Sequence, residues 1–537
     1  MRKLALAFAW VILAIPCQAR VIYVDANTPD NNDGSSWGKA YKYLQNALAD
    51  ANSSGDVNEI WVADGNYYPD ANTDEPNGSG SREATFQLIN GVAMYGGFAG
   101  GETSLDERDW QTNVTTLSGD INTPGDASDN SYHVVTGSGV DETAVLNGFT
   151  ITGGNANGGS FPNNAGGGMY NDQGSPTVTN CTFSGNSAYG DTWYGGAGIY
   201  NNSYSSPTVT NCTFSGNTTE YCGGGVNNQS NSSPKLTNCT FTDNWAGRYG
   251  GGMYNRSNCS PTITNCKFSS NSTGGSSSEH AGGAMRNIFD SSPMLTNCTF
   301  SGNWAADFGG AMANAASQPN MTNCTFSGNT ADANNGGGMF CSDSNATLTN
   351  CILWGNTAGT DGNEIALTTS STIDVNYCDV EGGEAGIYKE DSNCTVIWGN
   401  DNIETDPLFA DADLRLQYNS PCIDAGDNIS VPNDIDDFDN DGNMIEPIPY
   451  DLDGRDRFTD GDCNDSYIVD MGACEFSYAY IGDFDADCAV DFVDYAILTD
   501  YWLMDELLVD IAPTPGGDGI IDWRDLDILC GNWLVGK

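Results

Sequence analysis

The sequence predicts an all-β chain whose centre winds into a right-handed parallel β-helix. Three observations support this expectation: a string of residues that recurs about every 27 positions, an alternation of apolar and polar residues within each copy, and 66 glycines among 537 residues. Short strands joined by tight turns need such a composition, whereas helical repeats need apolar residues at a spacing of about 3.6. The chain is therefore expected to form a solenoid of stacked turns.

The recurring string reads Thr-Asn-Cys-Thr-Phe-Ser-Gly-Asn, and its cysteines mark the repeat. Successive cysteines are 31, 27, 27, 32, 26, 27 and 27 residues apart, and the last belongs to a degenerate copy. An asparagine precedes each of the first seven cysteines, a phenylalanine (leucine in the seventh copy) follows two positions later, and a second asparagine comes after it. The cysteines are Cys181, Cys212, Cys239, Cys266, Cys298, Cys324, Cys351 and Cys378.

One copy shows how the repeat should fold. Val178, Cys181 and Phe183 alternate with threonines, so they can point inward while the threonines face outward. Asn180 tolerates the left-handed backbone of a sharp corner, where its amide can bond the next asparagine in the stack. Glycine clusters such as residues 166–169 relieve a second corner. A turn of this length suits a three-sided coil, with turns about 4.8 Å apart, and the two longer units are expected to carry longer loops at one corner.

Both ends of the coil need covers. Residues 40–48 carry apolar side chains at helical spacing and are expected to form an amphipathic helix over the N-terminal end. Residues 59–68 would be an early turn. The expected division is a coil over residues 20–400, with its cap at about 20–57 and regular repeats at about 165–380, and Asp-rich last turns over residues 401–479.

The N-terminus has the features of a signal peptide over residues 1–19. Arg2 and Lys3 precede an apolar run too short to span a bilayer comfortably, and Ala19 is a small residue at the expected cleavage point. Cys17 raises the alternative of a lipoprotein, although Pro16 stands where such signals have a small residue. No later stretch is long and apolar enough for a transmembrane helix. The expected location is secreted, extracellular or at the cell surface.

The charge balance excludes two kinds of partner. Lys and Arg number 18 against 71 Asp and Glu, which gives a formal net charge of −53. This charge repels nucleic acid and anionic lipid, and it repels uronic-acid polymers unless a cation bridges them. Repulsion of this size also opposes compaction, so bound Ca²⁺ is expected.

Two Asp-rich loops near the C-terminus, within residues 480–537, have the ligand spacing of EF-hand-type calcium loops. Each is followed by an apolar stretch that should form a helix. Cys488 stands where such a loop usually has its turn glycine, and the second loop has Thr514 and Gly516 at its first two ligand positions, so Asp510 would have to reach in. The expected ligands are Asp483, Asp485, Asp487, Ala489 (through its carbonyl), Asp491 and Asp494 in the first loop, and Asp510, Asp518, Ile520 (through its carbonyl), Asp522 and Asp525 in the second.

A further acidic loop, residues 437–442, has carboxylates at every second position and a turn glycine, but its twelfth position is Ile448. Calcium binding and a solvated turn both remain open there.

Catalytic chemistry has few candidates in the repeats. A lyase needs a strong base beside a cation, and a glycoside hydrolase needs paired carboxylates on neighbouring turns. Arg286 stands beside a glycine cluster with His280 and Asp290 nearby, which could form a site, although loop polarity explains these residues as well. His133 is expected to lie in a strand of the coil rather than to act as a base. The other basic residues of the repeats are Lys235, Arg248, Arg256 and Lys267.

The repeat cysteines are too regular for a nucleophile. Stacked about 4.8 Å apart, they are either buried thiols or partly paired, because that spacing lies within disulfide reach. Cys422, Cys463 and Cys474 are the likelier disulfide partners.

Several strings resemble those of known families. The alternation of Gly-Gly-Ala/Gly-apolar strings with Phe-x-x-Asn resembles the repeat of chlamydial polymorphic outer-membrane proteins, and the wider pattern resembles the secreted, pectin-lyase-like β-helix proteins of planctomycete-type bacteria. The two Asp loops with their helices resemble a type I dockerin, which implies calcium and a cohesin-like domain as partner. The matching strings are residues 22–25, 33–37, 86–88, 94–98, 406–409, 420–426 and 470–475.

Two functions from different classes follow. One is a non-enzymatic secreted or cell-surface solenoid that acts in adhesion, scaffolding or glycan binding, with a C-terminal docking module. The other is an extracellular polysaccharide lyase or glycoside hydrolase that carries a dockerin-like tail. The regular repeats favour the first, because an active site should interrupt them with unlike polar residues. The tail favours the second, because dockerins are best known on carbohydrate-active enzymes.

Calcium should stabilise residues 480–537 and leave the coil nearly unchanged, because the aspartates of the first loop repel one another without a cation. We expect the tryptophan fluorescence and thermal unfolding of the tail in the full chain to differ between calcium and chelator. Asp487→Ala should weaken this difference more than Asp522→Ala, because the first loop has the fuller ligand set. Identical spectra and unfolding in both conditions would contradict a metal site in these loops.

Overall fold

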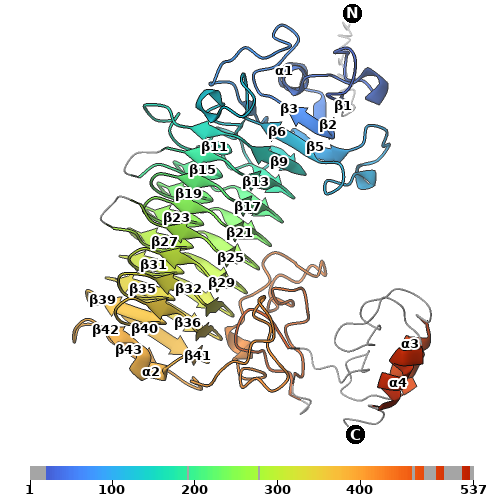
Figure 1. The fold of residues 1–537 in the computed structure, drawn as a ribbon. Coiled ribbons are helices and arrows are strands. Elements are labelled where there is room, and N and C mark those ends of the chain that lie inside the picture. Colours follow the sequence, from blue (N-terminus) through green and yellow to red (C-terminus); the bar gives the residue numbers. More distant parts are fainter. Residues whose placement is uncertain are drawn as a thin grey trace, which may run out of the picture.

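The chain folds into a right-handed parallel β-helix, as the sequence predicts (Figure 1). This computed structural model describes residues 20–189, 193–275, 279–461, 466–476, 492–500 and 523–531. Within these residues, strands of successive turns pair in parallel and form four sheets along the coil, which we name A to D. Because each strand pairs with its counterparts one turn away, unpaired edges remain only at the ends of the sheets.

The sheets have the following strands, in spatial order. Sheet A contains β1 (Arg20–Val24), β2 (Val57–Ala63), β5 (Ala93–Phe98), β8 (Val145–Asn147), β12 (Thr177–Thr179), β16 (Thr208–Thr210), β20 (Lys235–Thr237), β24 (Thr262–Thr264), β28 (Met294–Thr296), β32 (Asn320–Thr322), β36 (Asn345–Thr349), β40 (Thr372–Asn376) and β43 (Thr395–Trp398). Sheet B contains β3 (Gly65–Tyr67), β6 (Thr115–Ser118), β9 (Phe149–Thr152), β13 (Thr182–Ser184), β17 (Thr213–Ser215), β21 (Thr240–Thr242), β25 (Lys267–Ser269), β29 (Thr299–Ser301), β33 (Thr325–Ser327), β37 (Ile352–Trp354) and β41 (Asp379–Val380). Sheet C contains β4 (Phe86–Gln87), β7 (Val135–Thr136), β11 (Met169–Asp172), β15 (Ile199–Asn202), β19 (Val226–Gln229), β23 (Met253–Arg256), β27 (Met285–Ile288), β31 (Met312–Ala315), β35 (Met339–Ser342), β39 (Ile365–Thr368) and β42 (Tyr388–Lys389). Sheet D contains β10 (Asn155–Ala156), β14 (Ser187–Ala188), β18 (Thr218–Thr219), β22 (Trp245–Ala246), β26 (Ser272–Thr273), β30 (Trp304–Ala305), β34 (Thr330–Ala331) and β38 (Thr357–Ala358).

Columns of like side chains fill the interior, as predicted. Val178, Cys181 and Phe183 are at most 1% exposed, and the register pairs Phe183 with Phe214 on the next turn. The phenylalanine rings from Phe183 to Phe326 stack with centroids 4.6–5.1 Å apart. A slip of one residue would turn such a column outward, so the columns fix the register as well as the core.

The cysteine column consists of buried free thiols. A typical member, Cys239, donates from Sγ to the carbonyl oxygen of Thr237 at 3.3 Å. Cys422 and Cys474 are also buried free thiols, so the disulfide prediction is wrong for them. The reason at Cys422 is that its Sγ donates to Asp379 Oδ2 at 3.2 Å. Cys463 lies outside the described residues.

Both predicted corners are confirmed. Asn180 and its equivalents through Asn350 have φ between 51° and 54°. At the second corner Gly166 has φ +75°, and a Cβ there would lie 2.7 Å from the carbonyl oxygen of Met169. Asparagine and glycine are the residues that adopt this left-handed backbone most readily.

Two asparagine columns lie inside the coil and join its turns through their amides. From Asn186 to Asn356, in the column that the repeat predicts, each Nδ2 donates to the next Oδ1 at 2.8–3.1 Å. The second column, from Asn171 to Asn314 in sheet C, has bonds of 2.7–2.8 Å. The members of both columns are at most 3% exposed. The second column was not predicted, although the string Met-Tyr-Asn recurs at residues 169–171 and 253–255.

The cross-section differs from the expected three-sided coil. Sheets A, B and C are long, and the corner between B and C carries the additional sheet D. Its strands have only two residues, which is too short for sequence periodicity to reveal. The two longer units do place their extra residues at one corner, between sheets D and C, at residues 189–198 and 274–284.

The N-terminal cap forms, but its bounds differ from those expected. Helix α1 (Leu44–Ser54) buries Leu44, Ala47 and Leu48 against the coil. Residues 40–43 precede it without helical structure, because Asn31 Oδ1 accepts the backbone N–H groups there. Strand β1 already pairs with β2, so the first turn of the coil comes before the cap helix in the chain. Strands β2 and β3 confirm the early turn.

Residues 401–461 and 466–476 run back along the outside of the coil instead of forming its last turns as expected (Figure 1). We call this segment the flank. Inside it, Arg457 donates to Glu475 Oε1 at 2.5 Å, and both side chains are fully buried. Arg457 also donates to Asn297 Oδ1 at 2.7 Å, which ties the flank to a corner of the coil. The other contacts of the flank with coil residues include Lys235 with Asp436, Lys267 with Asp453, Thr325 with Ala473, and Asn350 with Asp427.

The remaining helices are short. They are η1 (Trp37–Lys39), η2 (Leu105–Glu107), η3 (Ala127–Asp129), α2 (Gly383–Gly386), η4 (Asn428–Ser430), α3 (Phe492–Asp500) and α4 (Trp523–Gly531). Helices α3 and α4 follow the two Asp-rich loops, where helices were expected, and they contact each other. None of the helices in the described part of the chain has the length and apolar character that crossing a membrane requires.

Glu364 ends the buried asparagine column that begins at Asn186. Its carboxyl group is 2% exposed and accepts hydrogen bonds from the Asn356 backbone at 3.1 Å and from the Asn356 amide. Burial raises the pKa of Glu364 to about 8, against these hydrogen bonds, which favour the charged form.

The stability of the coil should therefore contain a pH-dependent contribution from Glu364. Because its pKa in the folded chain lies above the ordinary 4.5, this contribution is full below pH 4.5 and is lost as the pH rises to about 8. Over that range the free energy of unfolding of the parent should fall by about 3–5 kcal/mol through Glu364. Glu364→Gln should remove this fall. The measurement is the free energy of unfolding against pH, with the exposed Glu384→Gln as control; parallel curves for the parent and Glu364→Gln would refute the assignment.

Candidate functional site

The five basic residues of the repeats divide into two groups. Lys235 and Lys267 form ion pairs with the flank, the second at 3.5 Å from Asp453. These lysines therefore hold the flank against the coil. The arginines, Arg248, Arg256 and Arg286, instead lie on the outer side of sheet C and in the loop before β23.

Each of these arginines lies over an aromatic ring. The Arg256 guanidinium is 4.4 Å from the ring centroid of Trp193 and 5.5 Å from that of Phe289. Arg248 and Arg286 both lie against Tyr249, at 5.2 and 5.6 Å. These distances are those of cation–π contacts. We call these six residues the arginine–aromatic surface: Trp193, Arg248, Tyr249, Arg256, Arg286 and Phe289.

The strands explain this arrangement. In sheet C the first and third residues of a strand face the core, so Met253 and Asn255 point inward while Tyr254 and Arg256 point outward. The register then places Arg286 beside Tyr254 on the next turn. The surface also borders the corner between sheets D and C, where both longer loops lie.

Several buried polar atoms at this surface have no hydrogen-bond partner among the described residues. They are Nε of Arg248 and Arg256, Nε and Nη1 of Arg286, and the hydroxyl of Tyr254. Burial lowers the pKa of Arg286, and Glu279 partly opposes this effect. Glu279 accepts the Tyr249 hydroxyl at 2.9 Å, and burial together with this bond raises the pKa of Tyr249 to about 12. The surface therefore combines half-buried arginines with aromatic rings, of which Phe289 is exposed and Tyr249 is buried. In the described part of the chain, its cations are not neutralised by direct carboxylate contacts.

The structure does not assemble the site expected from Arg286, His280 and Asp290. His280 Nδ1 donates to Asp307 Oδ2 at 2.8 Å, and its Nε2 accepts the Gly275 N–H at 3.1 Å, so both ring nitrogens are occupied. Asp290 is exposed at a corner. Among the described contacts, no hydrogen bond or ion pair joins these three residues. Sequence reasoning found Arg286 but missed its aromatic neighbour Tyr249, because Tyr249 lies outside the repeated string.

His133 is a structural residue, as expected. Its Nδ1 donates to the carbonyl oxygen of Gly166 at 2.9 Å, and burial lowers its pKa, so the ring is held neutral.

Most of the calcium ligands expected near the C-terminus lie outside the described residues. Asp494 is in α3, and Asp525 is in α4, where it is 1% exposed. The residues outside are Asp483, Asp485, Asp487, Ala489, Asp491, Asp510, Asp518, Ile520 and Asp522.

The acidic loop of the flank does bring carboxylates together. Ligand oxygens of Asp437, Asp439 and Asp441 lie within 4.8 Å of one another, as do those of Asp434, Asp439 and Glu446. Burial raises the pKa of Asp434, and the charges of Asp439 and Asp437 add to this effect. Oxygen donors of this kind suit Ca²⁺. The alternation of aspartates in residues 437–442 predicted the first group but not the contribution of Asp434 and Glu446.

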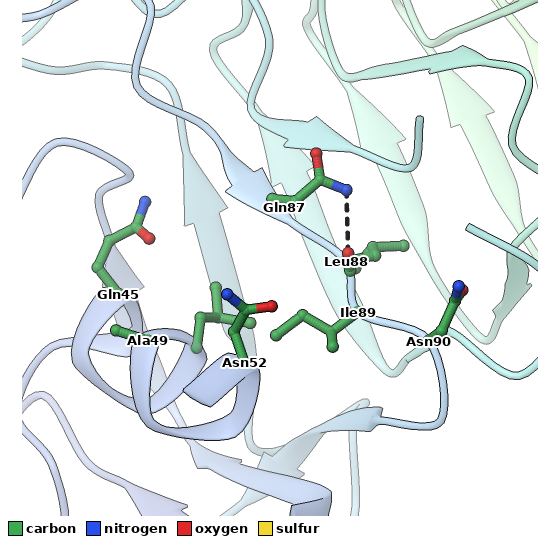
Figure 2. Close-up of a pocket in the computed structure, with 8 residues that line it drawn as sticks. Gln45, Ala49, Asn52, Gln87, Leu88, Ile89 and Asn90 are labelled. Carbon is green, nitrogen blue, oxygen red and sulfur yellow. Dashed lines mark hydrogen bonds between the residues drawn. The ribbon is translucent and has the colours of Figure 1, made fainter. Parts of the chain in front are cut away.

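A groove of about 440 Å³ lies where the cap helix meets the coil (Figure 2). Gln45 and Asn52 of α1 face residues 87–90 across it. Gln45 donates to the carbonyls of Pro69 and Thr85, and Gln87 donates to that of Leu88. These amides hold the backbone in place, and the lining contains no titratable side chain. The groove therefore has a structural role between the cap helix and the coil.

Comparison with known proteins supports the fold. A family model described as a right handed beta helix region matches residues 160–293 and 277–404. The crystal structure of pectate lyase Pel9A is similar at 16% identity, covering 86% of this chain and 97% of that one, with a TM-score of 0.47. The crystal structure of Dettilon tailspike protein (gp208) is similar at 13% identity, covering 70% and 68%, with a TM-score of 0.33. Structural likenesses this weak carry no argument about activity, and no curated protein matches the chain.

Proposed function

We propose that this chain is a secreted or cell-surface β-helix that binds glycans in adhesion or scaffolding and does not cleave them. The arginine–aromatic surface carries the proposal. A guanidinium that lies on an aromatic ring presents N–H donors beside an apolar face, a combination that suits the hydroxyl rim and the apolar face of a sugar. The side chains of Arg248, Arg256 and Arg286 are half-buried, and their guanidinium groups would donate hydrogen bonds to acceptors in such a ligand.

The regularity of the coil below this surface supports binding rather than catalysis. Strands β23 and β27 carry the same inward asparagine as their neighbours β19 and β31, and the asparagine column passes beneath the surface without interruption. Glycoside hydrolysis needs two carboxylates around one bond. Among the described residues, the carboxylate that contacts the surface, Glu279, is bonded to Tyr249.

A polysaccharide lyase is the second candidate. The observation in its favour is that burial lowers the pKa of Arg286, as a base in proton abstraction requires. A lyase would also need a cation or another strong acid group beside the substrate carboxylate.

The C-terminal residues 480–537 are proposed to dock the coil to a cohesin-like domain in the presence of calcium. The described helices support this proposal in one respect. Leu498 and Leu529 are buried, whereas Phe492, Val493 and Tyr495 of α3 are 76%, 50% and 41% exposed. Three exposed apolar side chains on one short helix suit contact with a protein partner.

Glycan binding should depend on the arginines and should leave the ligand intact. We expect the full chain to retain at least one member of a panel of neutral, carboxylated and sulfated polysaccharides, and Arg256→Ala to weaken that binding roughly tenfold or more. Lys39→Ala removes a positive charge from an exposed side chain that is far from Arg256 in the sequence. This variant should bind the polysaccharide as the parent does. Affinity electrophoresis measures the binding.

Product analysis of the same mixtures separates the two candidates. Unsaturated or new reducing ends that disappear in Arg286→Ala would establish the enzyme and refute the adhesion function. Binding that is equal in the parent and Arg256→Ala would remove the arginine–aromatic surface from the proposal.

A further inference from the structure

Sheet D presents a narrow outer face with an unusual composition. Its strands point one residue outward in each turn, and these residues are in register along the coil. None of them is charged, although the chain carries a net charge of −53. They are Asn155, Ser187, Thr218, Trp245, Ser272, Trp304, Thr330 and Thr357.

Aromatic side chains occur on this face at every second turn. Trp245 and Trp304 are separated by the turn of Ser272, and Tyr189, directly after β14, is separated from Trp245 by the turn of Thr218. Trp304 is 37% exposed and Tyr189 is 57% exposed. With turns about 4.8 Å apart, two turns span about 9.6 Å.

The Trp304 ring reaches over the preceding turn. A Cβ added to Gly274 would be 2.7 Å from Cζ3 and 3.1 Å from Cη2 of this ring, so the glycine leaves the space in which the indole rests. Trp245 likewise lines a hollow of about 190 Å³ together with Thr218 and Glu220 of the turn before it, and with Tyr189 and Ser187. Hydroxyl groups and aromatic rings therefore lie next to one another on this face, with Trp245 and Trp304 in one line and Tyr189 beside it.

We infer that this face binds an uncharged, extended β-1,4-linked glycan whose chain runs parallel to the coil axis. A pyranose ring has an apolar face that stacks on an indole and a rim of hydroxyls that bonds to serine, threonine and asparagine. The spacing of two turns is close to the length of one disaccharide of such a chain, so Trp245 and Trp304 would stack on alternate sugars, and Tyr189 would meet the chain from the margin of the face. An acidic glycan would meet Glu220 and Asp332 at the margin of the face and the net charge of the chain.

This site is separate from the arginine–aromatic surface, so the two can be tested independently. The probe is cellohexaose, with maltohexaose as a ligand of the same composition and a helical shape, and the readout is isothermal titration calorimetry on the full chain. We expect cellohexaose to bind and maltohexaose to bind much more weakly. Trp304→Ala should weaken cellohexaose binding roughly tenfold or more.

Gly274→Ala provides a second variant that keeps the indole but lifts it from the sheet. It should weaken binding as Trp304→Ala does. Gly274 has no left-handed φ that only glycine accommodates, so alanine adds no backbone strain at this position. Tyr204→Ala is the matched control, because Tyr204 is 72% exposed at another corner, and it should bind as the parent does.

Equal affinity of Trp304→Ala and the parent, or binding lost only in Arg256→Ala, would overturn this inference while leaving the proposed function intact. Binding lost in Trp304→Ala and unchanged in Arg256→Ala would support the inference and move the proposed glycan contact to sheet D. Sedimentation velocity that shows a dimer of the parent and a monomer of Trp304→Ala would identify the face as an interface between copies and overturn the inference.

Discussion

A column of buried side-chain amides joins the turns of this coil. Each asparagine of the column accepts from the backbone N–H and the Nδ2 of the asparagine on the preceding turn, and donates onward to the next. Its Nδ2 also donates to the backbone carbonyl of the phenylalanine in the middle of the sheet B strand one turn before. Burying so many polar groups is costly unless they are bonded, and the column bonds them by repeating one geometry. The phenylalanine and cysteine columns can then pack beside it in a single register.

Because the inward columns hold the turns together, the outward residues can differ from one face of the coil to another. Along the Asn180 corner, the flank covers the coil and uses Lys235, Lys267 and Asn297 as anchors. On sheet C, arginines lie on aromatic rings, and on sheet D, Trp304 lies over Gly274. Residues that repeat at one position of every turn form lines with the spacing of the turns, which is a geometry that a regular polymer can match. This is the physical reason to propose a glycan as the ligand.

The repeat made much of the core predictable, because each position recurs in an equivalent environment. Val178, Cys181, Phe183 and Asn180 could be placed from one copy, and the corner glycines followed from backbone sterics. Contacts outside the repeat could not be placed. The flank meets the coil through pairs such as Lys267 and Asp453, which lie 186 residues apart, and nothing local signals them. The same holds for the site: Arg286 stood out as a rare cation, but its partner Tyr249 comes from a neighbouring turn, and His280 bonds to Asp307 instead.

The amide column is tested most directly by Asn244→Leu, which keeps the side-chain volume nearly constant while removing its polar atoms. In the parent, Asn244 bonds to Asn217, to the Phe214 carbonyl and to Asn271 at 2.9–3.2 Å. Each buried group left unsatisfied costs about 1–3 kcal/mol, so the account predicts that the free energy of unfolding in urea falls by at least about 3 kcal/mol. A leucine variant as stable as the parent would show that the amides merely fill space, and that the apolar columns alone hold the turns together.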